Sequence, residues 1–271
     1  MISLDWKERL IQDTKDFYER KLPQKDYDID IVYNAYPQRI DNKIPNAVIT
    51  LVGKTIASLI AKQAEDYFPF YDYLLEKKGE NGSIIFAYIM AKAITKNGPV
   101  FLKYLEKYLL SVEDQKMCNF IVDKTIYPLM KKTGKEHLDT ITNLLKKGNH
   151  TLNLSLQKLL IKLISHNNEM IEPIFHKLES SWLYANEEMI KLNAAVLKEI
   201  YKHDADYYFK VFHTYSHTRN PVFAEILGGA ICAYNDEIGE MVEVWASSGN
   251  IKLKKIGVHS EKVLKKYKKK K

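Results

Sequence analysis

Five similar apolar helix starts recur along the chain, and their regular spacing is the feature that most limits the fold. They begin at residues 82, 115, 151, 187 and 220, so successive starts are 33, 36, 36 and 33 residues apart. Within each segment, apolar residues recur with the 3.6-residue period of one helix face. No long alternating apolar–polar stretch with hairpin dipeptides competes with this pattern. The chain is therefore predicted to be all-α.

A second amphipathic segment follows each start, and short breaks such as TKNGP, KKTGK and SHNN separate the segments. Helix pairs at this spacing cannot bury both faces alone, so they stack side by side. The signatures of tetratricopeptide and ankyrin repeats are absent. We therefore predict a right-handed α-solenoid of HEAT-like helical repeats, with an irregular helical bundle as the alternative.

The ends of the chain differ from the repeats. Residues 3–21 predict an N-terminal helical cap with a mostly apolar stripe that includes Trp6, Leu10 and Phe17. Three prolines exclude a continuous helix over residues 22–45, which is interpreted as a connector with a short extended piece in DIDIVYNAY. One domain of residues 1–271 is expected, with repeats over 46–250 and a Lys-rich tail over 251–271.

Composition is that of a globular chain, with 46% hydrophobic and 28% charged residues. No apolar run approaches the roughly 20 residues needed to cross a bilayer, so no membrane association and a cytoplasmic location are expected. Cys118 and Cys232 each lie in an apolar helical pattern without CxxC spacing and are interpreted as reduced core thiols.

The positive charge is concentrated in the tail. Residues 250–271 hold ten Lys and one Glu, a net +9 against +7 for the whole chain, so residues 1–249 carry −2. Lysine contacts phosphate as a point charge and gives binding with little sequence preference. A short helix capped by Ser260 would present the candidate phosphate-contacting residues to solvent, and these are Lys262, Lys265, Lys266, Lys268 and Lys269. A solvated tail without function is the alternative.

Two segments carry a resemblance to a known family. MCNFIVDKTIYPLMKKTGKEHLDTITNLLKKGNHTLNLSLQKLLIKLIS and MIKLNAAVLKEIYKHDADYYFKVF resemble the signatures of the HEAT-like DNA alkylation repair glycosylases. That resemblance implies a catalytic role for Asp123 in the excision of 3-methyladenine or 7-methylguanine from DNA. A carboxylate there would stabilise the positive charge that develops on the sugar as the base departs.

Three positions depart from the family pattern. Asn119 replaces an aromatic residue, Ala195 replaces a tryptophan, and LNLSLQK lacks the arginine pair. A cationic base would then lack its cation–π partners. We therefore expect nucleic-acid binding without base excision. The alternative interpretation of Asp123 is a solvated residue on a structural helix. An active glycosylase with a cleft built from tyrosines is the other enzymatic alternative.

The remaining candidates point to binding rather than catalysis. His213 and His217 have the i, i+4 spacing of metal ligands, but they are interpreted as helix-end residues, and neither a metal nor a cofactor is expected. The second segments change from Lys-rich to Glu-rich along the chain, so a uniform electrostatic track for a duplex is missing. A protein partner on the concave surface, with the chain acting as an interaction scaffold, is the alternative function.

Overall fold

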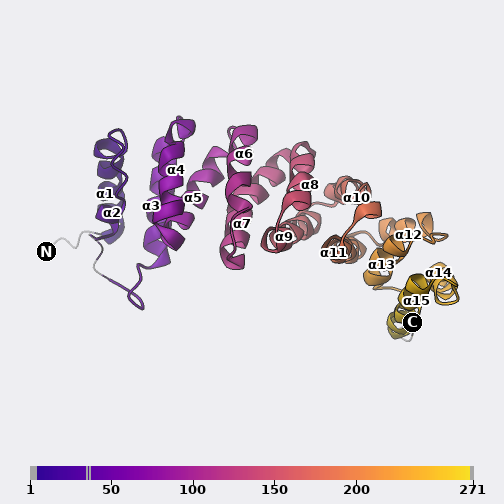
Figure 1. Ribbon diagram of the computed structural model, residues 1–271. Helices are drawn as coiled ribbons and strands as arrows, with labels where there is room; N and C mark the ends of the chain where they lie inside the picture. Colours follow the sequence, from indigo (N-terminus) through magenta and orange to yellow (C-terminus); the bar gives the residue numbers. More distant parts are fainter. Residues whose placement is uncertain (1–4, 35, 37, 269–271) are drawn as a thin grey trace. The chain divides into compact units, whose positions relative to one another are not determined.

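The computed structural model describes residues 5–34, 36 and 38–268, and the prediction of an all-α chain is confirmed over these residues. Figure 1 shows the helices in chain order. The described residues contain no β-strand, and a single isolated bridge joins Ile40 to Lys43. No helix among them combines the length and the apolarity needed to cross a membrane.

The helices expected from the spacing are present. The first helices of the five pairs are α5 (Gly79–Ala93), α7 (Gln115–Thr133), α9 (His150–His166), α11 (Glu187–His203) and α13 (Pro221–Ala230). The second helices are α6 (Gly98–Leu109), α8 (Leu138–Lys147), α10 (Ile171–Glu179), α12 (Ala205–Thr214) and α14 (Asp236–Ala246). Short 3-10 turns η1 (Ala64–Tyr67), η2 (Gly134–His137), η3 (Asn168–Met170) and η4 (Trp182–Tyr184) join some of them.

The chain divides into two compact units, residues 1–132 and 133–271. Unit 1 also contains α1 (Trp6–Arg20), α2 (Asp30–Asn34), α3 (Asn46–Ile60) and α4 (Phe68–Lys77). In this unit α1 packs on α3, and α3 packs on α5. Gly53 permits the second contact, because a Cβ there would lie 3.1 Å from Ile85 Cα. The helix α2 corrects the expectation of an extended piece between residues 28 and 36.

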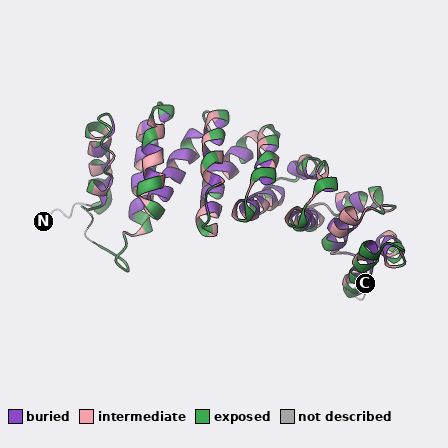
Figure 2. Cartoon of the chain, in the orientation of Figure 1, coloured by how far each residue is buried: buried purple, intermediate pink, exposed green. Residues whose placement is uncertain are grey.

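Unit 2 has the same kind of packing. Helices α9, α11, α13 and α15 (Ile251–Lys268) contact each other in turn, while α8 packs on α10. In Figure 2 the buried residues lie on the helix faces that meet within each unit. Trp182 is buried here, and its indole Nε1 donates a 2.8 Å hydrogen bond to Asn193 Oδ1. This bond satisfies a donor that burial would otherwise leave unpaired.

Asparagine side chains begin the first helices of unit 2. Asn149, Asn186, Asn220 and Asn250 each accept a hydrogen bond from a backbone N–H in the first turn of the following helix. This is the usual N-cap arrangement. Asn250 therefore starts α15, and the expectation that Ser260 caps a short terminal helix is wrong. Ser260 lies inside α15 and is buried.

Candidate nucleic-acid-binding surface

Asp123 lies on the exposed side of α7 in unit 1. The opposite side of the helix is buried in the core and includes Ile121, Val122 and Ile126. The side chain of Asp123 is exposed, in agreement with its expected position at the wet face of the helix. The apolar period of α7 therefore directs this carboxylate away from the core.

A cluster of two aromatic rings and two ammonium groups lies beside Asp123 in sequence. The rings of Tyr88 (α5) and Phe120 (α7) meet edge to face, with centroids 6.1 Å apart and planes inclined by 69°. Lys54 Nζ (α3) lies 5.5 Å from the Tyr88 centroid, and Lys124 Nζ lies 5.6 Å from the same centroid and 5.8 Å from that of Phe120. These distances are within the range of cation–π attraction. We call these four residues the lysine–aromatic cluster.

Further lysines continue the basic surface between the same three helices. Lys92 Nζ donates to Ser58 Oγ at 3.1 Å, Lys96 Nζ donates to the Ala61 carbonyl at 2.9 Å, and Lys132 Nζ donates to the Thr95 carbonyl at 3.3 Å. Each acceptor is an uncharged oxygen on a neighbouring segment, so each lysine keeps its full charge. With the two cluster lysines they form what we call the lysine row: Lys54, Lys92, Lys96, Lys124 and Lys132.

The positive charge of the lysine row is uncompensated by ion pairs. Within the described parts of the chain, none of its five ammonium groups lies in a salt bridge with a carboxylate. Lys124 is half-buried and the other four are exposed. Five like charges on α3, α5, the turn after α5 and α7 create a local field that attracts anions.

The surroundings of Asp123 are poorly suited to a cationic base. The family's aromatic position is taken by Asn119, whose Oδ1 accepts a 3.2 Å hydrogen bond from Gln115. Phe120 supplies an aromatic ring one residue later, but Lys124 lies over that ring. A positively charged purine would have to displace an ammonium group and would be repelled by it. This repulsion disfavours a cationic base at the lysine–aromatic cluster.

The other sequence candidates lie in unit 2, each in its own setting. Lys262, Lys265, Lys266 and Lys268 are exposed on α15, and Lys269 falls outside the described residues. Lys268 Nζ lies 5.2 Å from the ring centroid of Tyr234. The helix itself is anchored by buried Leu253, Gly257, Ser260 and Leu264, so this segment is not a solvated tail over residues 251–268.

The two histidines of HTYSH lie on different local structures. The helix α12 ends at Thr214, so His213 is in its last turn while His217 lies in the following turn. His213 Nδ1 lies 2.6 Å from Glu237 Oε1 of α14. No group of three His, Cys, Asp or Glu side chains with metal-binding geometry occurs in the part of the chain that the structure describes.

Neither Cys118 nor Cys232 forms a disulfide bond in the described structure. Cys118 is buried and Cys232 is half-buried, beside Tyr208. Burial raises the pKa of the Cys232 thiol, although the Tyr208 hydroxyl and two lysines act in the opposite direction. A thiol with a raised pKa is a weak nucleophile at neutral pH. Cys232 is therefore a weak candidate for a catalytic nucleophile.

The comparisons give no relative for this chain. No protein-family model, no curated protein and no solved structure matches it. The candidate surface therefore rests on its own geometry.

Proposed function

We propose that this chain is a nucleic-acid-binding helical-repeat protein that contacts phosphate groups through the lysine row of unit 1. The observation that carries the proposal is the uncompensated charge of that row. Ammonium groups that replace condensed counterions on phosphates supply binding free energy without reading the base sequence. The exposed lysines of α15 add a second set of phosphate contacts.

The aromatic rings of the lysine–aromatic cluster suit the same ligand. Tyr88 and Phe120 are both partly exposed, and their ring edges and faces lie among ammonium groups. Proteins that bind single strands combine such rings, on which bases stack, with lysines that follow the backbone. We therefore propose that unpaired or distorted segments are bound in preference to a regular duplex.

The repeat architecture of the DNA alkylation repair type is part of this proposal. In unit 1, α1 contacts α3 and α3 contacts α5. These contacts support a row of stacked helices that begins with α1 as the N-terminal cap. The succession α9, α11, α13 and α15 in unit 2 supports the same principle. A right-handed solenoid of HEAT-like pairs, with α15 as a further helix of the row, accounts for both. Base excision is not part of the proposed function, because the family's aromatic positions and arginine pair are not matched and Lys124 lies over the Phe120 ring.

A direct test compares charge removal on the row with charge removal elsewhere in unit 1. The row variant carries Lys54→Gln, Lys92→Gln and Lys124→Gln. The control variant carries Lys77→Gln, Lys103→Gln and Lys107→Gln, which alter exposed lysines of α4 and α6 by the same net charge. Affinity for fluorescent oligonucleotides is measured by anisotropy. The row variant is expected to bind about tenfold more weakly, and the control within about twofold of the unaltered protein. Equal losses in both would refute a specific surface.

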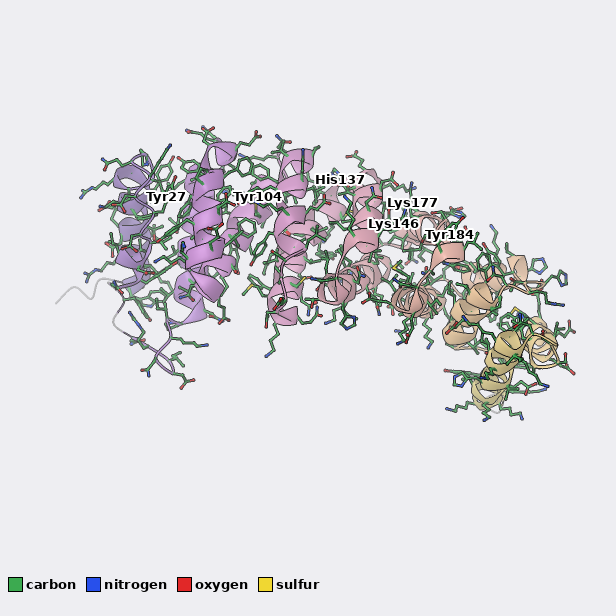
Figure 3. All side chains as sticks on the ribbon, viewed as in Figure 1. Tyr27, Tyr104, His137, Lys146, Lys177 and Tyr184 are labelled. Atoms are coloured by element: carbon green, nitrogen blue, oxygen red, sulfur yellow. The ribbon has the colours of Figure 1, made fainter. Side chains whose placement is uncertain are left out.

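One observation favours the alternative of a protein-interaction scaffold. Leu183 and Tyr184 of η4 are 53% and 86% exposed, and Tyr184 is labelled in Figure 3. Adjacent exposed apolar and aromatic side chains are typical of protein-binding surfaces. A photo-crosslinking residue at position 184 would form one discrete protein adduct in cells if this surface binds a partner. A crosslinking pattern equal to that from exposed position 206 would argue against the scaffold.

A further inference from the structure

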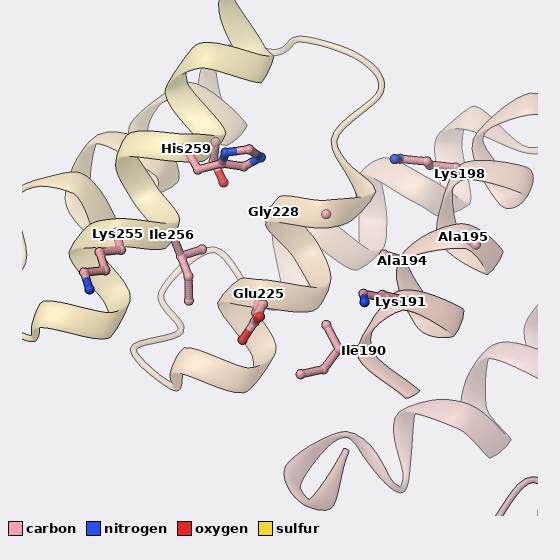
Figure 4. A pocket seen from close by; sticks show the side chains of 12 residues that line it. Ile190, Lys191, Ala194, Ala195, Lys198, Glu225, Gly228, Lys255, Ile256 and His259 are labelled. Carbon is pink, nitrogen blue, oxygen red and sulfur yellow. The ribbon is translucent and has the colours of Figure 1, made fainter. Parts of the chain in front are cut away.

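A cavity of about 510 Å³ opens between α11, α13 and α15 in unit 2 (Figure 4). Its floor consists of small residues, Ala194 and Ala195 on α11 and Gly228 and Gly229 on α13. Ile190 and Ile256 complete the apolar lining. The cavity is separate from the lysine row, which lies in unit 1, so the inference below goes beyond the proposed function.

The two glycines allow α13 to pack closely on its neighbours. A Cβ at Gly228 would lie 2.5 Å from Ser260 Oγ, and one at Gly229 would lie 3.1 Å from Ala194 Cβ. Glycine is an unfavourable residue in helices, so two in succession are explained by this close approach. The part of the lining that these residues form is therefore small and apolar, without a bulky or charged side chain.

Ser260 joins α15 to α13 beside this cavity. The residue is 1% exposed, and its Oγ has no hydrogen-bond partner among the described residues. This oxygen packs against Gly228 and is closed to solvent, so the hydroxyl belongs to the helix contact and is not a ligand group.

Lys198 gives the rim of the cavity a positive charge. Lys198 of α11 and His259 of α15 extend toward each other from opposite sides above Gly228 (Figure 4). Glu225 is the carboxylate of the lining, and its Oε2 is paired with Lys252 Nζ at 3.3 Å. Lys198 forms no ion pair within the described parts of the chain. The side of the cavity between Lys198 and His259 therefore favours an anionic group.

We propose that this cavity binds a phosphomonoester of a flat ring, with the dimensions and chemistry of a nucleoside monophosphate. The ring lies on the glycine–alanine floor between Ile190 and Ile256. The phosphate lies between Lys198 and His259, where both side chains donate hydrogen bonds to its oxygens.

Calorimetric titration of the full chain with adenosine monophosphate tests the proposal. Adenosine lacks the phosphate, and ribose 5-phosphate lacks the ring, so both are expected to bind at least about tenfold more weakly than the nucleotide, as expected for a lost charged or stacking contact. Competition by 5′-phosphorylated but not 5′-hydroxyl oligothymidylate would identify a chain end as the source of the phosphomonoester. Competition by the mononucleotide alone would identify a free nucleotide.

Two variants locate the binding. Lys198→Met removes a rim charge, and Ala195→Leu fills the cavity. Both are expected to weaken nucleotide binding, and Lys198→Met is expected to do so without lowering the melting temperature, because this lysine is exposed. Lys158→Met and Ala205→Leu, at exposed positions outside the lining, are the matched controls. No heat of binding in the unaltered protein, or equal affinity in Ala195→Leu, would overturn the proposal.

Discussion

The Asp123 carboxylate and the Lys124 ammonium are neighbours on α7, and their surroundings differ. Lys124 lies over two aromatic rings, whereas Asp123 is exposed. The exposure of Asp123 could be predicted from the period of the helix, because the apolar residues of α7 lie on the opposite face. The cation–π contacts could not be predicted, because Tyr88 and Lys54 precede Lys124 by 36 and 70 residues and lie on other helices.

Base excision should not depend on Asp123. The purified protein is expected to release 7-methylguanine or 3-methyladenine from alkylated DNA no faster than its Asp123→Asn variant, because Lys124 and Lys54 repel a cationic base. Release of free base is measured by chromatography of the supernatant. A glycosylase activity that is lost in Asp123→Asn would contradict this expectation and would restore the catalytic reading of the carboxylate.

Leu197 tests the core of unit 2. The side chain lies on α11, the first helix of the fourth pair, and is 1% exposed. Leu197→Ala should lower the free energy of unfolding by about 2–5 kcal/mol, the usual cost of truncating a buried leucine. Urea unfolding gives the value, and exposed Asp123→Asn is the control, with an expected change below about 0.5 kcal/mol. The reverse order would mean that Asp123 is a structural anchor.

Glu199 is a buried carboxylate that the sequence pattern did not single out. Burial acts to raise the pKa of this carboxyl, but hydrogen bonds from Lys202, Ser165 and His203 outweigh it and hold the pKa below the ordinary 4.5. The Lys202 and Ser165 bonds measure 2.7 and 2.9 Å. Ser165 belongs to α9, so the carboxylate joins two first helices. The sequence offers Lys202 and His203 at i+3 and i+4, but it does not reveal the Ser165 contact.

A lowered pKa means that folding favours the ionised form of the Glu199 carboxylate. The contribution of this carboxylate to the free energy of unfolding is therefore complete above pH 4.5, and it is lost as the pH falls through the lower pKa of the folded state. Glu199→Gln should therefore destabilise the protein by about 1–3 kcal/mol at pH 7, as expected for charge-assisted bonds. The difference from the unaltered protein should shrink as the pH falls below 4.5. Denaturant unfolding at both pH values measures it. A difference that grows in acid would contradict the assignment.

At the scale of elements, the recurrent helix starts predicted α5 through α14 because apolar periodicity is a local signal. The role of α15 was missed, since its lysines resemble a solvated tail in composition. The helix packs on α13 and α14 and is anchored by Leu253, Leu264 and the close approach at Gly257, where a Cβ would lie 2.2 Å from Ala246 N. The signal that could have located it is Asn250, which follows the caps Asn149, Asn186 and Asn220 at a comparable interval.

The packing of α15 predicts an effect of truncation that a loose tail would not show. Deleting residues 260–271 removes buried Ser260 and Leu264 and should lower the melting temperature by several degrees, about what a loss of 1–3 kcal/mol produces in a chain of this size. Replacing Lys262, Lys265, Lys266 and Lys268 with Gln keeps the helix and should leave the melting temperature nearly unchanged. Calorimetry distinguishes the two variants. Equal melting temperatures for the truncated and unaltered proteins would show that α15 contributes nothing to unit 2.

At the scale of the whole molecule, net charge alone pointed to the C-terminal lysines and concealed the lysine row. Residues 1–249 carry a net −2, yet the row gathers five lysines in unit 1. The row is built from residues on α3, α5 and α7, and only helix packing brings them together. The charges of the second helices, which the sequence analysis compared, could not reveal the row. Its lysines lie on α3, α5 and α7 and in the turn after α5.

The most direct test of the nucleic-acid-binding claim is the salt dependence of oligonucleotide binding by the unaltered protein, the row variant and the control variant. Each phosphate contact contributes about −0.9 to the slope of log K against log salt on a duplex and about −0.7 on a single strand. Loss of three contacts should therefore flatten the slope by about 2–2.7 in the row variant. The control variant should keep the slope of the unaltered protein. Identical slopes for all three proteins, or a slope near zero for the unaltered protein, would contradict phosphate binding by the lysine row.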